Sequence, residues 1–289
     1  MSRSLRPLAE LATPRRLWRI HRRFLSTEWT RLSETHSYLR DATRNREIHL
    51  IGTAHVSQKS ADEVRDLIHL VRPSHVAVEL CPSRAARLRA GDKEDQFALA
   101  VQQQLGGGHG FLGAGFQMLN NLWKSYGLIP GVDFKAALDA ADAVGAPAHC
   151  IDRDVDETLR LLRGALSEVS FEKLMTTPPP ADLTSSMSGL SGGMAGIAEA
   201  VEQLKNRQQV AAMRRFMNTA APSIVEVMLH QRDRHMVRRL RETCVSGTAV
   251  GVVGLAHMDG IEAEWMMQEE MKKSEQEKID GYYQASIDR

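Results

Sequence analysis

The sequence predicts an α/β protein with a mostly parallel sheet, flanking helices and a helical insertion. Short apolar segments typical of buried strands alternate with longer stretches whose apolar residues repeat at helical spacing. The chain has 289 residues, of which 43% are hydrophobic and 25% charged, enough to bury a large core. Because a crossover helix usually joins parallel strands, this alternation favours a parallel sheet with right-handed connections.

The first elements form a strand–helix–strand–helix unit. Residues 47–52 and 75–80 are the two predicted strands. Between them, Ser60 and Glu63 have the spacing of a capping box, which predicts that the first helix begins at Ser60. Pro82 directly follows the second strand, and we expect it to start the second helix.

The rest of the chain is mainly helical, with two more predicted strands at residues 148–152 and 250–254. A final helix is expected from about Asp259, giving way to a mobile charged tail after Lys272. The other predicted helices cover about residues 112–126, 133–144, 195–217 and 223–244, with one more from Val155. We expect the two longest of these to form a hairpin over the sheet.

Three regions are predicted along the chain. Residues 46–272 form the α/β domain, with the helical insertion over about 104–245, and residues 273–289 form a polar tail. Residues 1–45 form a basic N-terminal arm whose early part is rich in arginine and poor in acidic residues. This amphipathic, basic composition resembles a mitochondrial presequence. The arm therefore predicts a mitochondrial location, and the alternative is a solvated N-terminal helix on a cytoplasmic protein.

Composition argues against several classes of function. The 37 basic and 36 acidic residues leave a formal net charge of +1, which gives no field to attract nucleic acid. No apolar run approaches the roughly 20 residues that cross a bilayer, so no transmembrane segment is expected. The three cysteines form no CxxC motif, which argues against both a zinc knuckle and a disulfide framework.

Polar residues follow all four strands of the predicted parallel sheet. The first and last strands each run into a Gly-x-x-His sequence, which ends at His55 and His257. Glu79 lies at the end of the second strand, and Asp152 at the end of the third. Since the carboxyl ends of parallel strands meet at one edge, where open α/β sheets bind their ligands, these side chains predict a single polar site.

Each of these residues also has a more ordinary interpretation. A lone histidine after a strand is usually a turn or cap residue, and Glu79 could form an ion pair with Arg84. Asp152 could belong to a local ion network at the start of the next helix. Arg232 and Asp233, in the middle of a charged helix, would ordinarily be solvated surface.

Five short motifs occur in an order and spacing that resemble those of a known family. They are Gly-Thr-Ala-His-Val-Ser (52–57), Val-Glu-Leu-Cys (78–81) followed by Arg84, Ile-Pro-Gly (129–131), Ile-Asp-Arg-Asp (151–154), and Gly-Leu-Ala-His (254–257) followed by Gly260-Ile261. Together they resemble the TraB/PrgY/Tiki family over about residues 47–271. This resemblance implies an erythromycin-esterase/ChaN-like fold, an α/β core with a helical insertion.

The same resemblance implies an active site at His55, His257 and Glu79, the residues that the strand ends select independently. In this family a glutamate is usual where the chain has Asp133, which shortens the reach toward a metal or substrate by one methylene. Several relatives have membrane-spanning helices that this sequence lacks. Further polar positions of the family match Arg84, Asp152, Arg153, Arg232 and Asp233.

Two imidazoles and a carboxylate suit a divalent metal ion, with Mn²⁺ or Co²⁺ favoured and Zn²⁺ possible. Since Tiki-type relatives are metal-dependent proteases, we expect a metal-dependent hydrolase of an amide or ester, and a peptidase is one form of it. His55, His257 and Glu79 would be the ligands, with Arg84 or Arg153 stabilising an oxyanion. The alternative is a non-catalytic TraB-domain regulator or adaptor at an organelle surface, which binds a protein partner through its long helices.

Overall fold

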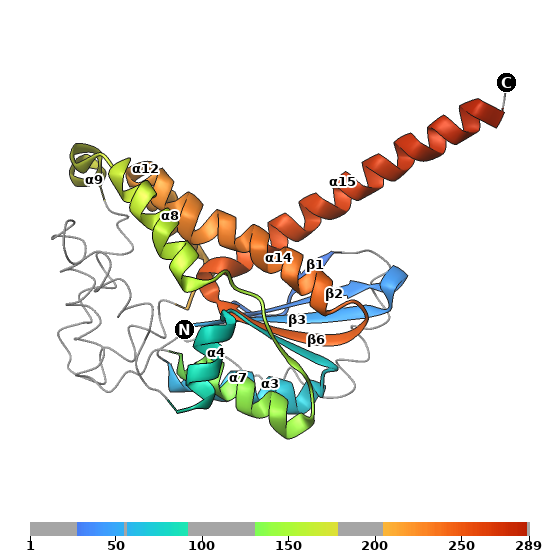
Figure 1. Ribbon diagram of the computed structural model, residues 1–289, viewed down its shortest axis with the longest axis horizontal. Coiled ribbons are helices and arrows are strands. Elements are labelled where there is room, and N and C mark those ends of the chain that lie inside the picture. Colours follow the sequence, from blue (N-terminus) through green and yellow to red (C-terminus); the bar gives the residue numbers. More distant parts are fainter. Residues whose placement is uncertain (1–27, 55–56, 92–130, 179–204, 288–289) are drawn as a thin grey trace, which may run out of the picture.

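The computed structural model describes residues 28–54, 57–91, 131–178 and 205–287. Within them a six-stranded sheet has the order β1-β2-β3-β6-β4-β5, shown in Figure 1. Its strands are β1 (Trp29–Arg31), β2 (His36–Asp41), β3 (Arg46–Thr53), β4 (His75–Val78), β5 (Ala148–Cys150) and β6 (Gly247–Gly254). The α/β class predicted from the sequence is confirmed.

The four strands predicted from the sequence, β3, β4, β5 and β6, are all present and pair in parallel. The last of them in sequence, β6, lies between β3 and β4. Its register pairs Gly52 with Val253 and Thr53 with Gly254. The two strands that lead into the Gly-x-x-His sequences therefore end side by side at one edge of the sheet.

The sequence analysis did not predict β1 and β2, which lie in residues assigned to the basic arm. They extend the sheet as an antiparallel edge, with β2 paired to β3 from His36–Ile51 to Asp41–Arg46. The sequence of β2 hides its strand character because polar residues fill buried positions. Asp41, for example, is fully buried and accepts a hydrogen bond from the Arg46 guanidinium at 2.8 Å.

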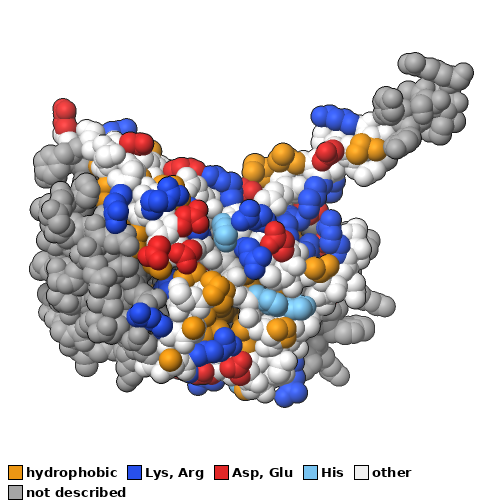
Figure 2. Space-filling view, in the orientation of Figure 1, with side chains coloured by type: hydrophobic (Ala, Val, Ile, Leu, Met, Phe, Trp, Pro, Cys, Tyr) orange, Lys and Arg blue, Asp and Glu red, His pale blue; other side chains and the backbone are white. Residues whose placement is uncertain are grey.

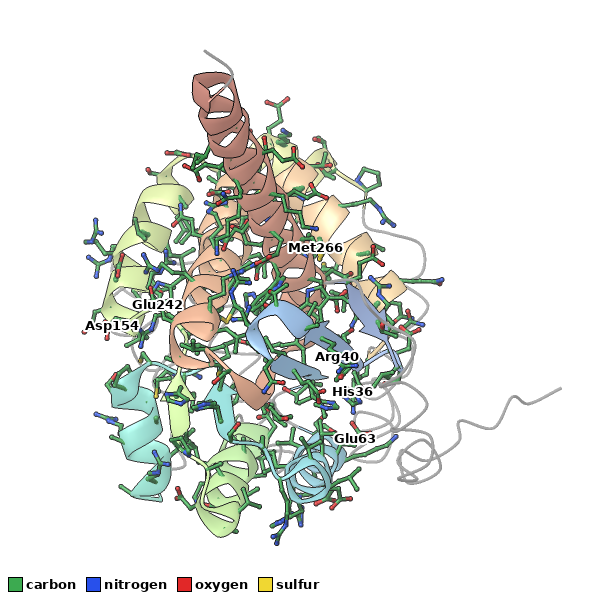
Figure 3. All side chains as sticks on the ribbon, turned by 90° about the vertical axis from the view of Figure 1, so that its right-hand side faces the viewer. His36, Arg40, Glu63, Asp154, Glu242 and Met266 are labelled. Atoms are coloured by element: carbon green, nitrogen blue, oxygen red, sulfur yellow. The ribbon has the colours of Figure 1, made fainter. Side chains whose placement is uncertain are left out.

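Helices cover both faces of the sheet (Figure 1). On one face, α3 (Gln58–Val71) and α7 (Val132–Val144) pack over a buried apolar cluster that includes Ile51, Val78 and Phe134. On the other face, α14 (Gln231–Thr243) and the start of α15 (Leu255–Ile287) pack over a second cluster that includes Leu50, Met236 and Trp265. Figure 3 shows His36 between the sheet and α3.

The first helix begins earlier than the capping box predicted. Ser57 is the N-cap of α3, and its hydroxyl accepts a hydrogen bond from the Ser60 backbone N–H at 3.1 Å. Ser60 lies inside the helix, where its own hydroxyl accepts from the Ala54 N–H at 3.4 Å. The predicted start at Ser60 is therefore wrong by one turn, because Ser57 takes the capping role.

The helical insertion is described in part. Its elements are α8 (Val155–Ser167), α9 (Phe171–Thr176), α12 (Arg207–Ala220), α13 (Pro222–Val225) and the π-helical turn η3 (Glu226–His230), which leads into α14. The helix predicted at about 112–126 and the start of the one predicted at 195–217 lie outside the described residues. The short helix α4 (Pro82–Arg89) follows β4 and starts at Pro82, as predicted.

Instead of ending near Lys272, α15 continues as one helix to Ile287, and its distal half projects from the body of the protein (Figure 1). All side chains of residues 270–279 are exposed, among them Met271 at 64%. The prediction of a mobile tail after Lys272 is wrong for the part of α15 described here. No helix in the described ranges is long and apolar enough to span a membrane.

Candidate functional site

Glu79 lies directly after β4, at the carboxyl edge of the sheet. Its backbone N–H donates to the Val252 carbonyl at 3.0 Å, which continues the pairing of β4 with β6. Its carboxylate is 4% exposed at the residue level, and Oε2 accepts a hydrogen bond from the Gly254 N–H at 2.6 Å. Gly254 precedes the first residue of α15, so the carboxylate lies at a helix N-terminus, where backbone dipoles stabilise negative charge.

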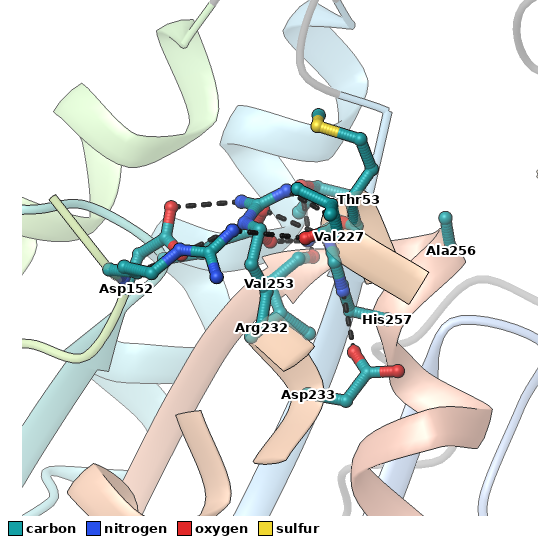
Figure 4. Close-up of polar contacts among 12 residues, drawn as sticks. Thr53, Asp152, Val227, Arg232, Asp233, Val253, Ala256 and His257 are labelled. Atoms are coloured by element: carbon teal, nitrogen blue, oxygen red, sulfur yellow. Dashed lines mark hydrogen bonds and ion pairs between the residues drawn. The ribbon is translucent and has the colours of Figure 1, made fainter. Parts of the chain in front are cut away.

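His257 lies in the first turn of α15, because that helix begins at Leu255, directly after β6 ends at Gly254. The imidazole is buried and bridges two carboxylates (Figure 4). Its Nδ1 lies 2.6 Å from Oδ1 of Asp233, and its Nε2 lies 3.3 Å from Oε1 of Glu79. A short turn after the central strand thus places the histidine directly above the end of the neighbouring strand.

The two carboxylates determine the protonation of His257. Burial by itself would lower the pKa of the imidazole, but the charge of Glu79 and the hydrogen bonds to Asp233 and Glu79 raise that pKa to about 9. The nearby Arg232 opposes this rise without cancelling it. In this arrangement both ring nitrogens carry protons at neutral pH, and each faces a carboxylate oxygen.

A helical glycine permits the close approach of Asp233 to His257. Gly260 lies one turn after His257 on α15, and a Cβ there would be 1.9 Å from Oδ2 of Asp233. On the same side, a guanidinium nitrogen of Arg214 on α12 lies 3.7 Å from that oxygen and donates to the Ala256 carbonyl at 3.4 Å. Arg214 and Gly260 therefore fix the position of the carboxylate that orients the imidazole.

Arg232, next to Asp233 on α14, joins the ends of β4 and β5. Its Nη2 donates to Oε1 of Glu79 at 2.5 Å and to Oδ2 of Asp152 at 2.8 Å, while its Nε donates to Oδ1 of Asp152 at 3.0 Å. Burial disfavours the charged guanidinium, but the charges of Asp152 and Glu79 outweigh it and raise the pKa of Arg232. The pair expected to be solvated helix surface is instead buried at the sheet edge.

These contacts form a buried row of groups whose charges alternate in sign. Three carboxylates are balanced by two guanidiniums and the imidazolium of His257, so the row is neutral when His257 is protonated. When His257 is neutral, the row has one excess negative charge. Its members in spatial order are Arg214, Asp233, His257, Glu79, Arg232 and Asp152.

The π-helical turn η3 lies immediately before Arg232 and Asp233. The Gln231 N–H donates to the Glu226 carbonyl, five residues back, as expected in a π-helix. Two carbonyls of this turn accept from guanidiniums of the site. Arg153 donates to the Val227 carbonyl at 3.0 Å, and Arg232 donates to the Met228 carbonyl at 3.2 Å.

The two arginines proposed for an oxyanion differ in their surroundings. The Arg153 guanidinium is buried and donates to Thr158 at 3.1 Å and to Gln231 at 2.9 Å, in addition to its contact with η3. Arg84 on α4 is half-buried and makes no hydrogen bond or ion pair with the described residues. The ion pair between Arg84 and Glu79 considered from the sequence is absent from these residues, since the guanidinium that binds Glu79 belongs to Arg232.

Asp133 anchors the end of the neighbouring strand. It is fully buried in the first turn of α7 and accepts a short hydrogen bond from the Thr53 hydroxyl. That hydroxyl also lies 3.2 Å from the Val253 carbonyl on β6. His55 follows Thr53 by two positions and lies outside the described residues.

The structure thus brings together His257, Glu79 and Asp152 with the second-tier pair Arg232 and Asp233. It adds Arg214 and Gly260, which the sequence analysis did not assign to the site. Gly260 was noticed only as part of a motif, although a glycine one turn after His257 in a helix is a signal of close packing. Arg214 lies in a charged helix with no sequence feature that distinguishes it from its neighbour Arg215.

The donors of this site fit part of a metal centre. The described residues contain no group of three His, Cys, Asp or Glu side chains suited to a metal ion. They do contain His257 Nε2 and Glu79 Oε1 at 3.3 Å, and two ligands at about 2.1 Å from one ion lie roughly 3.0 to 3.4 Å apart. The contact of Nδ1 with Asp233 is the carboxylate–histidine arrangement that orients metal ligands. A third protein ligand would have to come from outside the described residues.

Comparisons with known proteins agree with this site. The sequence model of the TraB/PrgY/gumN family matches residues 151–275. An uncharacterized protein of Methanocaldococcus jannaschii is 29% identical over 225 residues, which are 74% of this chain and 52% of that protein. The TraB domain-containing proteins of Homo sapiens and Mus musculus are each 26% identical over 245 residues, which are 75% of this chain and 62% of theirs.

The chain therefore spans about half to three fifths of the length of these relatives. The matched segment contains Asp152, Asp233 and His257, which the structure brings to one sheet edge. The expected resemblance is confirmed, and through residues 151–275 the chain belongs to the TraB/PrgY/gumN family.

Proposed function

We propose that the protein is a metal-dependent hydrolase that acts on an amide or ester, with its centre between Glu79 and His257. The observation that carries this proposal is the 3.3 Å contact of His257 Nε2 with Glu79 Oε1. A neutral imidazole whose Nδ1–H donates to Asp233 would turn a lone pair toward a carboxylate oxygen. Such a contact requires a positive species between the two atoms, either a proton or a metal ion.

His257, Glu79 and His55 are the proposed ligands, and Mn²⁺ or Co²⁺ suits this nitrogen and oxygen set, with Zn²⁺ also acceptable. When bound, the metal would activate a water molecule and polarise the scissile carbonyl. Asp233 holds the Nδ1 proton of His257 and thereby directs Nε2 toward Glu79. Arg232 lies against Glu79 and Asp152 and limits the negative charge of the centre.

Arg84 is the better candidate for stabilising an oxyanion. Its guanidinium has no partner among the described residues, and α4 begins three positions after Glu79. The donors of Arg153 are taken by Thr158, Gln231 and Val227, so a substrate would have to displace one of these contacts. We therefore assign the oxyanion to Arg84 and a supporting role to Arg153.

Metal analysis tests this proposal. Protein purified without oxygen in the presence of Mn²⁺ or Co²⁺ should retain about one metal ion per chain. The variants His55→Ala, His257→Ala and Glu79→Gln should each lose it, and a panel of peptide and ester substrates should be hydrolysed by the loaded wild type alone. Equal metal content in wild type and the three variants would refute the ligand assignment.

A second candidate, supported by the projecting part of α15, is a non-catalytic regulator or adaptor. This segment presents Met267, Met271 and Ile279 to solvent, as the orange side chains along the arm indicate (Figure 2). Exposed apolar side chains on a helix suit binding to a protein partner. An adaptor would retain its cellular function in the double variant His55→Ala with Glu79→Gln, whereas a hydrolase would lose it.

We also propose a mitochondrial location, on the basis of the arginine-rich composition of the N-terminal arm. A fluorescent protein fused behind residues 1–45 should accumulate in mitochondria. The same fusion with the arginines up to position 23 changed to glutamine should remain in the cytoplasm. Cytoplasmic fluorescence of the first fusion would instead favour the cytoplasmic alternative.

A further inference from the structure

Arg232 is bound unequally to its two carboxylate partners. It holds Asp152 through two donors, Nε to Oδ1 at 3.0 Å and Nη2 to Oδ2 at 2.8 Å, which is the bidentate geometry that suits a guanidinium best. It reaches Glu79 through Nη2 alone. Its Nη1 donates to the Met228 carbonyl of η3 at 3.2 Å.

This inequality means that Arg232 and Glu79 can separate without leaving either group unsatisfied. After separation, Arg232 keeps both hydrogen bonds to Asp152 and the one to Met228. Glu79 keeps the hydrogen bond from the Gly254 N–H to its Oε2. Only the shared Oε1 would change its partner, and that oxygen is the one that faces His257 Nε2.

The charges of the buried row give such a separation a cause. The row is balanced when Arg232 and protonated His257 both contact Glu79, and a divalent ion would replace the proton on His257. The ion and the Arg232 guanidinium would then meet at the same carboxylate oxygen, where two cations in a buried site repel each other.

We propose that Arg232 is an exchangeable cation that neutralises Glu79 in the metal-free protein and is retained by Asp152 when a metal ion takes its place. This inference rests on the proposed function and specifies how the site is regulated. In this account, Arg232 competes with the metal for Glu79, and Asp152 determines how readily Arg232 leaves. The strength of metal binding is therefore set partly by two residues that are not ligands.

The two residues should affect metal affinity in opposite directions. Arg232→Met removes the competing cation and should tighten Co²⁺ binding at least tenfold. Asp152→Asn removes the carboxylate that retains Arg232, so that Arg232 stays on Glu79 and Co²⁺ binding weakens at least tenfold. The double variant, which loses both effects, should bind within about threefold of wild type. A general loss of folding would weaken binding in all three variants and could not produce this pattern.

Matched controls are available on the same elements. Arg234 on α14 is exposed and pairs with Glu226, and Asp156 is an exposed acid in the first turn of α8. Arg234→Met and Asp156→Asn remove the same charges at the surface and should leave Co²⁺ affinity unchanged within a factor of two. Affinity is measured by calorimetric titration of the full chain, after circular dichroism has shown that each variant is folded.

The outcomes separate this inference from the proposed function. Tighter binding by Arg232→Met together with weaker binding by Asp152→Asn supports the exchange. If wild type binds Co²⁺ and neither variant changes its affinity, Arg232 is a permanent structural tie and the inference is wrong, while the metal site stands. If wild type and Arg232→Met both fail to bind Co²⁺, the metal assignment and the inference are both wrong.

Discussion

His257 Nε2 and Glu79 Oε1 lie 3.3 Å apart although 178 positions separate them in the sequence. The contact exists because β6, the last strand in the chain, pairs with β4 and places Gly254 beside Glu79. A helix that starts immediately after β6 then turns His257 over the end of the neighbouring strand. The topology of the sheet therefore creates the site, and each prediction below changes one of its contacts.

Asp233→Asn should weaken metal binding about 10- to 100-fold, the usual cost of changing the residue that orients a ligating histidine. The amide keeps the shape of the carboxylate but removes the charge that holds the proton on Nδ1 of His257. Co²⁺ titration of wild type and variant measures the effect, with Asp156→Asn as the surface control. Unchanged affinity would show that Asp233 does not orient His257.

Gly260→Ala should damage the site and destabilise the fold, because its Cβ would lie 1.9 Å from Oδ2 and 2.6 Å from Cγ of Asp233. We expect a loss of about 1 to 3 kcal/mol in the free energy of unfolding, as for other overpacked sites. Gly164 on α8 is the matched control, since a Cβ there would meet nothing within 4 Å.

Gly164→Ala should instead stabilise the protein by about 0.4 to 1 kcal/mol, because alanine lowers the entropy of the unfolded chain in a helix that has room for it. Urea unfolding of both variants measures the contrast. Equal effects of the two substitutions would mean that Gly260 is not needed for the approach of Asp233.

The metal-free protein should lose stability as the pH rises from about 6.5 to 9. Because the folded state raises the pKa of His257 to about 9, its contribution is complete below the unfolded pKa of 6.5 and disappears at high pH. The slope attributable to this residue is at most about 1.4 kcal/mol per pH unit. Urea unfolding with a chelator should show this slope in wild type and a flatter profile in His257→Gln. Identical profiles would contradict the assigned imidazolium.

His36 should act in the opposite direction at acidic pH. It is buried on β2 with Nε2 3.0 Å from Nδ1 of His49, and burial lowers the pKa of His36 to about 4. A depressed folded pKa means that its contribution is present above pH 6.5 and is lost as the pH falls toward 4. Wild type should therefore lose stability relative to His36→Gln between these values. A constant difference between the two proteins would show that His36 does not titrate with folding.

Much of the fold could be predicted from the sequence because its signals are local. The apolar runs that form β3, β4, β5 and β6 are flanked by helical periodicity, and this alternation implies parallel pairing. The strand β2 could not be found in this way. Its buried positions hold polar residues such as Ser37, which donates to Glu262 on α15 at 2.7 Å, a partner 225 positions away.

The site was predicted in part for the same reason. Strand ends pointed to Glu79, Asp152 and His257, because a parallel sheet gathers its carboxyl ends at one edge. The role of Arg232 depends on how α14 lies over that edge, which no local pattern contains. Within a charged helix such a residue is indistinguishable from the exposed Arg234 until the helix is placed.

Anomalous diffraction from crystals grown with Mn²⁺ or Co²⁺ tests the central claim most directly. The account predicts one anomalous peak per chain between Nε2 of His257 and Oε1 of Glu79, about 2.0 to 2.3 Å from each. It also predicts that Arg232 has left Glu79 and remains bound to Asp152. A peak elsewhere, or none at this position in metal-loaded crystals, would contradict the proposed centre.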